Sequence, residues 1–284
     1  MADFKVASPS RGLEWFRGGV RMLDRNPRGL LTVTLGLAVL NQIPALAGAF
    51  SPAWLALSVL LSLLGPTLAA GLMVAIDDAD HGRPVSLASL FAGFQRPGVR
   101  GQLVQLGLLS VILGMLAGLA AWHLMGKENI ALFLALAQQK HPDPAQIQAI
   151  AVPFLKALLA GVTILFILLA GIFFAVPRVL FQGRAALPAF IESITACAAN
   201  VLPLTVYGLI FVLALVACAL ALGIFAAFAG LLGSVGLALM RVVLLALGVI
   251  VMLVGSSANY LAWRELFGGG SDDRPPPPRA GIVV

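Results

Sequence analysis

The chain has 284 residues, of which 60% are apolar and only 11% are charged. A soluble domain carries about 25% charged residues, so this composition excludes an ordinary globular surface and indicates contact with lipid. The net charge of +6 does not indicate a nucleic-acid-binding protein, because the basic residues lie at the ends of apolar segments and form no single basic face. The two cysteines provide neither a disulfide framework nor a zinc-binding pattern.

Six apolar runs are long enough to cross a membrane as helices. A spanning helix needs about 20 apolar residues, because the hydrocarbon core is about 30 Å thick. The runs are too long for the strands of a membrane barrel, which alternate in polarity over about ten residues. We therefore predict an all-α, polytopic transmembrane helical bundle with six spans, covering residues 29–49, 52–76, 103–124, 151–176, 201–226 and 237–263.

The basic residues alternate between the two ends of these spans. Fourteen of the eighteen Lys and Arg residues lie in segments 1–28, 77–102, 177–200 and 264–284; the other four are Lys127, Lys140, Lys156 and Arg241. Lys and Arg favour the cytoplasmic side, so both termini are predicted to be cytoplasmic, which requires an even number of spans. Lys156 and Arg241 lie near the outer ends of their spans, where long basic side chains extend to the headgroups.

Each cytoplasmic segment before an odd-numbered span contains a short amphipathic stretch. These stretches cover residues 11–24, 86–94 and 188–199, and helices of this kind lie in the membrane interface. In the first stretch, Leu13, Phe16, Val20 and Leu23 share one face. The chain thus resolves into three copies of interfacial helix, span, span. The expected organisation is a cytoplasmic segment 1–28, a six-span membrane domain 29–267 and a disordered Gly- and Pro-rich tail 268–284.

Local signals predict further details of the spans. Pro66 is expected to kink the second span, and Gly114 and Gly118 are expected to allow close helix packing. In the loop after the third span, residues 129–137 are predicted to form a short apolar helix on the membrane. Asp143 is the expected N-cap of the next helix, with Pro144 at its first position.

Several short motifs occur together along the chain: Trp15-Phe16 with Asn26-Pro27, Gly65-Pro66, and the segments 71–73, 80–84, 90–94, 190–208 and 260–267. Together they resemble an uncharacterised family of bacterial multi-span inner-membrane proteins, over most of residues 11–267. The sequence departs from that family at 126–150 and in the Pro-rich tail. More distantly, the helix-then-span pattern is similar to the membrane domain fused to some glycerophosphodiester phosphodiesterases. The resemblance implies a fold and an inner-membrane location but no chemistry, because the phosphodiesterase catalytic domain has no counterpart here.

Two polar groups of residues resemble parts of known active sites. Asp77, Asp78, Asp80 and His81 could contribute to a divalent-cation site, but no second cluster offers the remaining oxygen ligands. A solvated turn at a helix end is the favoured interpretation of this cluster. Ser257 lies in a Gly-Ser-Ser-Ala motif typical of some intramembrane serine proteases, yet His123, the histidine nearest a span, is expected at the opposite side of the membrane. No catalytic, cofactor-binding or metal-binding residues and no cofactor are therefore predicted.

The sequence favours a non-catalytic integral inner-membrane protein that acts through lipid or protein contacts. The expected partners are membrane lipids, with anionic headgroups preferred by the basic residues of segment 11–28, and an unidentified membrane protein. The alternative function is a channel or transporter for a small or apolar solute. That alternative requires a continuous polar lining between the spans, which the sequence does not display.

Overall fold

The structure is a computed structural model, and it describes residues 4–48, 51–139 and 143–268. Within these ranges the chain is helical and contains no strand. The α-helices are α1 (Arg11–Arg21), α2 (Pro27–Leu46), α3 (Pro52–Asp80), α4 (Ala92–Gln95), α5 (Val99–Ala137), α6 (Pro144–Gln182), α7 (Ala186–Ala199), α8 (Val201–Gly230) and α9 (Gly233–Phe267). Two short 3₁₀ helices, η1 (Met22–Asp24) and η2 (Leu87–Phe91), complete the fold.

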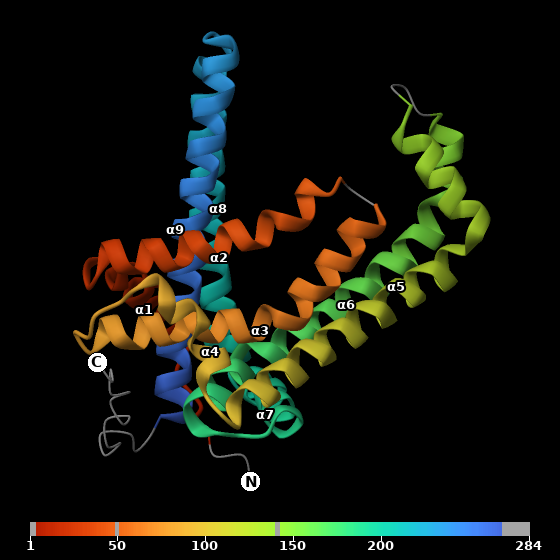
Figure 1. Cartoon of the computed structure of the whole chain (residues 1–284). Helices are drawn as coiled ribbons and strands as arrows, with labels where there is room; N and C mark the ends of the chain where they lie inside the picture. The colour runs from red at the N-terminus through yellow and green to blue at the C-terminus, as the bar shows by residue number, and fades with distance from the viewer. Residues whose placement is uncertain (1–3, 49–50, 140–142, 269–284) are drawn as a thin grey trace.

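Six of the described helices, α2, α3, α5, α6, α8 and α9, are long and apolar enough to cross a membrane, as the sequence predicts. They form three hairpins, α2–α3, α5–α6 and α8–α9, which diverge from one common end (Figure 1). Five of these helices are longer than the predicted spans, and α5 and α6 have 39 residues each, whereas α2 has 20 residues and ends at Leu46, before the predicted end at residue 49. A straight helix of that length measures about 58 Å, so α6 extends well beyond a 30 Å hydrocarbon core.

Helix ends and breaks follow local sequence signals. Asp143 caps α6 by accepting a hydrogen bond from the amide of Ala145 at 2.9 Å, and Pro144 is the first helical residue, which confirms the predicted start. Gly126 has a positive φ of 73° and separates the last eleven residues of α5 from the rest. This break places the predicted apolar segment 129–137 in a separate short helix. The end of the predicted tail, 269–284, lies outside the described residues.

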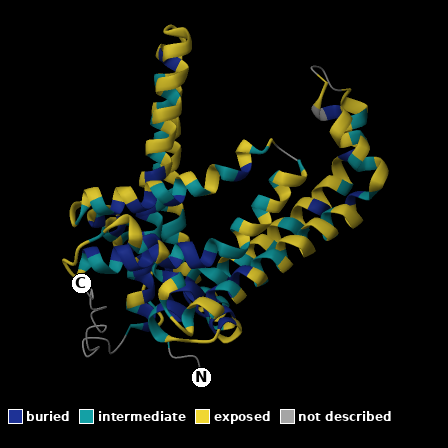
Figure 2. Ribbon diagram, viewed as in Figure 1, coloured by how far each residue is buried: buried dark blue, intermediate teal, exposed yellow. Residues whose placement is uncertain are grey.

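The protein core is concentrated at the common end of the hairpins. Buried residues gather in the C-terminal halves of α3, α6 and α9, at the N-terminal ends of α2 and α5, and in the short helices packed on them, whereas the outer parts of the hairpins are mostly exposed (Figure 2). We call this end the hub; it consists of residues 66–80 of α3, 171–182 of α6, 249–267 of α9, 30–37 of α2 and 103–106 of α5, together with α1, η2, α4 and α7. The helices α3, α6 and α9 contact one another there.

The three predicted amphipathic stretches are all helical. Each packs on the second helix of one hairpin, which is α3, α6 or α9. α1 packs on α9 and α8, η2 on α3 and α2, and α7 on α6. The middle stretch consists of η2 and α4 and includes no long α-helix. Glycines allow close approach at these contacts: a Cβ on Gly71 would overlap the Leu90 backbone, and one on Gly171 would overlap the Phe190 ring. The repeated contact pattern supports the threefold organisation.

The face of α1 that packs on the protein differs from the predicted apolar face. Gly12, Trp15 and Gly19 are buried against α8 and α9, because two glycines allow the helix backbone to approach within contact distance. The predicted face remains partly accessible, and Val20 is 42% exposed. α1 therefore has one face toward the protein and leaves Val20 open to lipid on the other side, where Phe16 contacts Phe211 of α8 and Leu23 packs on the core.

Two predictions about the spans have different outcomes. Gly114 and Gly118 are exposed and have no neighbour close enough for tight helix packing, so the packing role predicted for them is wrong. The close approach of α5 to α3 occurs instead at Gly107, beside the backbone of Leu63. α3 is continuous through Pro66 and changes direction along its length in Figure 1, as expected for an internal proline.

Candidate functional site: the polar hub

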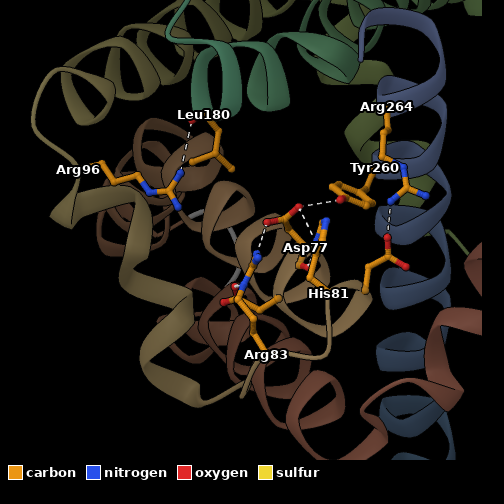
Figure 3. A network of polar contacts seen from close by, with 9 residues as sticks. Asp77, His81, Arg83, Arg96, Leu180, Tyr260 and Arg264 are labelled. Carbon is orange, nitrogen blue, oxygen red and sulfur yellow. Dashed lines mark hydrogen bonds and ion pairs between the residues drawn. The ribbon is translucent and has the colours of Figure 1, made fainter. Parts of the chain in front are cut away.

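The acidic cluster at the end of α3 is the centre of a hydrogen-bond network. Arg83 donates to Asp77 at 2.5 Å and to Asp78 at 2.6 Å, and the Tyr260 hydroxyl of α9 donates to the other Asp77 oxygen at 2.7 Å (Figure 3). His81 lies one turn after Asp77, with its Nδ1 2.8 Å from the Asp77 carbonyl oxygen. Asp77 therefore joins the end of α3 to both the following loop and α9.

A second set of ion pairs fastens α1 and α3 to the end of α9. Arg11 donates from Nε and Nη2 to the two oxygens of Glu265, both at 2.7 Å, and Trp15 Nε1 donates to the same carboxylate at 2.8 Å. Arg264, in the last turn of α9, pairs with Asp80 at the end of α3 and lies over the Tyr260 ring. Bidentate Arg–carboxylate pairs have defined geometry as well as strength, so these contacts fix the orientation of α1 on α9.

The most deeply buried charge in the hub is Arg178 of α6. Its side chain is 6% exposed and pairs with Glu192 of α7, which also pairs with the exposed Arg184. Burial acts to raise the pKa of the Glu192 carboxyl, but the hydrogen bonds and charges of Arg184 and Arg178 outweigh burial and hold that pKa below its usual value. Arg178 also lies 4.5 Å from the Phe267 ring of α9. A buried guanidinium of this kind depends on its carboxylate partner.

Side chains from α7 and α9 form hydrogen bonds to the backbone of α6 near Pro177, which lies inside this continuous helix. Pro177 has no amide hydrogen to donate to the carbonyl of Phe173, and Asn259 of α9 donates to that carbonyl at 2.9 Å. Ser193 of α7 accepts from the Phe174 amide at 2.9 Å and donates to the Ala170 carbonyl at 2.5 Å. These contacts join α9 and α7 to α6, and they explain why Asn259 and Ser193 lie in otherwise apolar helices.

The segment before α1 is held by the hub as well. Asn200, which is fully buried before α8, accepts from the Ala7 amide at 2.8 Å and donates to the Lys5 carbonyl at 3.2 Å. The Lys5 amide donates to the carbonyl of Leu266 at 2.9 Å. Residues near the start of the chain are thus joined to both α8 and α9.

The structure changes the interpretation of the acidic cluster. Asp77, Asp78 and Asp80 are engaged by Arg83, Tyr260 and Arg264, so the favoured interpretation as a merely solvated turn is incomplete. Within residues 4–48, 51–139 and 143–268, no three His, Cys, Asp or Glu side chains are placed to hold a metal ion. The alternative of a divalent-cation site therefore gains no support from the geometry.

The serine-protease motif does not assemble a catalytic pair. Ser257 is buried in the hub, and its hydroxyl has no hydrogen-bond partner among the described residues. His123 is exposed on α5, three residues before the break at Gly126. The two residues belong to opposite ends of the fold, as the sequence predicts.

Comparison with known proteins agrees with this architecture. A probable inner membrane protein of Burkholderia thailandensis is 26% identical over 273 residues, which cover 92% of each chain. No solved structure matches the chain. The sequence profile of a family described as "Domain of unknown function (DUF7847)" matches residues 13–264, which include α2 to α8 in full and most of α1 and α9. Because this match covers most of the chain, the protein belongs to the DUF7847 family.

Proposed function

We propose that this inner-membrane protein has no catalytic activity and that its hub binds the anionic inner leaflet through α1 and the residues that follow it. The observation that carries the proposal is the division of α1 into two faces. One face is occupied by α8 and α9, while Val20 and the basic residues around it remain exposed. This surface, which we call the basic strip, comprises Arg17, Arg21, Arg25 and Arg28.

The charge distribution supports a cytoplasmic location for the hub. Among the described residues, twelve of fifteen Lys and Arg residues lie at that end of the spans, and such a bias favours the cytoplasm. A basic residue near an anionic leaflet contributes about 1 kcal/mol, so the basic strip favours anionic lipid by a few kcal/mol before ordering costs. The apolar Val20 lies beside this strip and suits the interfacial layer.

The absence of catalysis is inferred from how the hub uses its ionisable groups. The carboxylates of Asp77, Glu192 and Glu265 accept hydrogen bonds from neighbouring arginines. Groups held in this way connect helices, and they lack the pairing of a nucleophile with a nearby base that a hydrolase needs. The distant likeness to the membrane domain of glycerophosphodiester phosphodiesterases concerns the helix-then-span pattern, and it implies no activity for this protein.

The test uses the full chain in lipid nanodiscs. Val20→Cys is introduced in a Cys197→Ala, Cys218→Ala background and labelled with an environment-sensitive dye. We expect bluer emission in discs containing 30% phosphatidylglycerol than in discs of phosphatidylcholine alone, with the difference lost at high salt. The Arg17→Gln, Arg21→Gln, Arg25→Gln, Arg28→Gln variant should lose the difference, while Arg241→Gln serves as the control. Equal emission in both lipids at low salt would contradict the proposal.

A further inference from the structure

A pocket of about 370 Å³ lies between α1 and the end of α9. Its lining contains two arginines, two glutamates, an indole and one aliphatic side chain: Arg11, Glu14, Trp15, Leu261, Arg264 and Glu265. The pocket is therefore polar, with both signs of charge on its walls. It is separate from the basic strip, whose residues do not line it.

The depth of the pocket along α9 places it beside the lipid headgroups. The predicted sixth span ends at residue 263, and Arg264 and Glu265 are the first charged residues after it. An apolar run of about 20 residues or more crosses the hydrocarbon core. Leu261 thus falls at the inner edge of the core and Arg264 and Glu265 just beyond it. Tryptophan, here Trp15, is enriched at that depth.

The pocket retains hydrogen-bonding capacity of both kinds. Arg11 uses Nε and Nη2 on Glu265, and a guanidinium has five N–H donors, so its Nη1 group remains available. Arg264 uses Nη1 on Asp80. Glu14 accepts at Oε1 from Arg17 over 3.3 Å, and its side chain is 45% exposed. Donors and acceptors are both available at the same opening.

This combination selects among possible ligands by charge. A simple anion would meet the carboxylates of Glu14 and Glu265, and a simple cation would meet two guanidinium groups. A ligand that carries a phosphate and a primary ammonium can place each group beside its opposite. Leu261 and Trp15 offer an apolar wall to the part of such a ligand that enters the membrane.

We propose that this pocket binds the headgroup of a zwitterionic phospholipid with a primary amine, its phosphate on Arg11 and Arg264 and its ammonium on Glu14. The inference rests on the proposed function in one respect, because it takes the hub to lie at the cytoplasmic headgroup layer. A trimethylated headgroup has no N–H to donate, so it fits the same pocket less well.

The test measures binding of short-chain lipids to the full-length protein in detergent. Dihexanoyl phosphatidylethanolamine, dihexanoyl phosphatidylcholine and inorganic phosphate are titrated separately and followed by microscale thermophoresis. We expect the ethanolamine lipid to bind at least about tenfold more tightly than the choline lipid, as for one charge-assisted hydrogen bond. Equal affinity for the two lipids overturns the proposal without requiring any variant, and inorganic phosphate binding as tightly as the ethanolamine lipid overturns it as well.

Glu14→Gln tests the assigned ammonium contact. Glu14 is exposed and lies in a single pair with Arg17, so the variant is expected to fold, which its thermal unfolding curve checks. It should bind both lipids equally, and retention of the preference would overturn the assignment. The Arg21→Gln, Arg25→Gln, Arg28→Gln variant should keep the ethanolamine preference. That variant weakens the basic strip and leaves the pocket lining unchanged. Loss of the preference for anionic lipid therefore tests the leaflet proposal, and loss of the preference for ethanolamine tests the pocket proposal.

Discussion

The hub and the outer halves of the hairpins are built on different principles. In the most apolar 18 residues of α3, which reach into the hub, 56% of residues are buried by protein, whereas none are buried in the corresponding stretch of α8. The hub combines this apolar packing with ion pairs between helices, while α8 exposes Leu213 and Leu220 at 67% each. The protein therefore holds its helices together at one end, and lipid must cover the remainder.

Packing between the hairpins explains this asymmetry. α2 contacts α3 in its own hairpin and α9 in another, and α5 contacts α6 in its own hairpin and α3 in another. Each of these two spans therefore joins two hairpins. α8 packs chiefly on α9 and on α1. In lipid, helices gain little from covering apolar side chains with protein, because lipid tails cover them equally well. Substitutions in the two regions should therefore have very different effects.

Loss of the buried ion pair should have the largest effect. Glu192→Gln removes the charge that compensates Arg178, whose side chain is 6% exposed. Breaking a buried pair by removing one partner costs about 3–5 kcal/mol, measured as the free energy of unfolding in detergent. Arg184→Gln, which removes the exposed partner of the same carboxylate, should cost about 1 kcal/mol or less. Equal costs would show that Arg178 does not depend on Glu192.

A pair of leucines compares the two regions directly. Leu253 is fully buried in the hub and Leu213 is 67% exposed on α8. Leu253→Ala should destabilise the protein by about 2–5 kcal/mol, because it leaves a cavity. Leu213→Ala should change the stability by about 0.5 kcal/mol, as at other sites outside the packed core. A large loss at Leu213 would mean that α8 packs on something other than lipid.

Two adjacent glycines test the docking of α1. A Cβ on Gly19 would lie 2.6 Å from the carbonyl oxygen of Val254, which belongs to the backbone of α9 and cannot move aside easily. Gly19→Ala should therefore cost about 1–3 kcal/mol. A Cβ on Gly18 meets the end of the Leu261 side chain, which can rotate, so Gly18→Ala should cost less. The opposite order, in thermal unfolding of the two variants, would refute the described packing of α1.

The Glu192 pair also predicts a pH dependence of stability. The pKa of Glu192 is lower in the folded protein, so its contribution is fully present above the unfolded pKa of about 4.3. That contribution is lost as the pH falls through the folded pKa. The difference in unfolding free energy between the wild type and Glu192→Gln should thus be constant near neutral pH and shrink below about pH 4.3. A difference that grew on acidification would contradict the sign of this shift.

The sequence predicts the number and order of the spans well, because long apolar runs have few alternatives in a membrane. It predicts the hub poorly, since hub contacts join residues that are far apart in the chain. Asp77 meets Tyr260, and Arg11 meets Glu265, and no local pattern identifies either partner. The docking face of α1 is not predicted, although Gly12 and Gly19, small residues seven apart with Trp15 between them, are a signal for close packing. The predicted fourth span ends six residues too early, because polar residues such as Arg178 continue α6 beyond the apolar run.

Cysteine accessibility tests directly whether the hub faces the cytoplasm. Single cysteines at Ala88, in the hub, and at Gln138, at the outer end of the α5–α6 hairpin, can be introduced in a background with Cys197→Ala and Cys218→Ala. Both positions are exposed on the molecular surface. An impermeant thiol reagent applied to cells with a permeabilised outer membrane should label position 138, and label position 88 only after the inner membrane is disrupted. Labelling of position 88 in cells with an intact inner membrane would contradict the account.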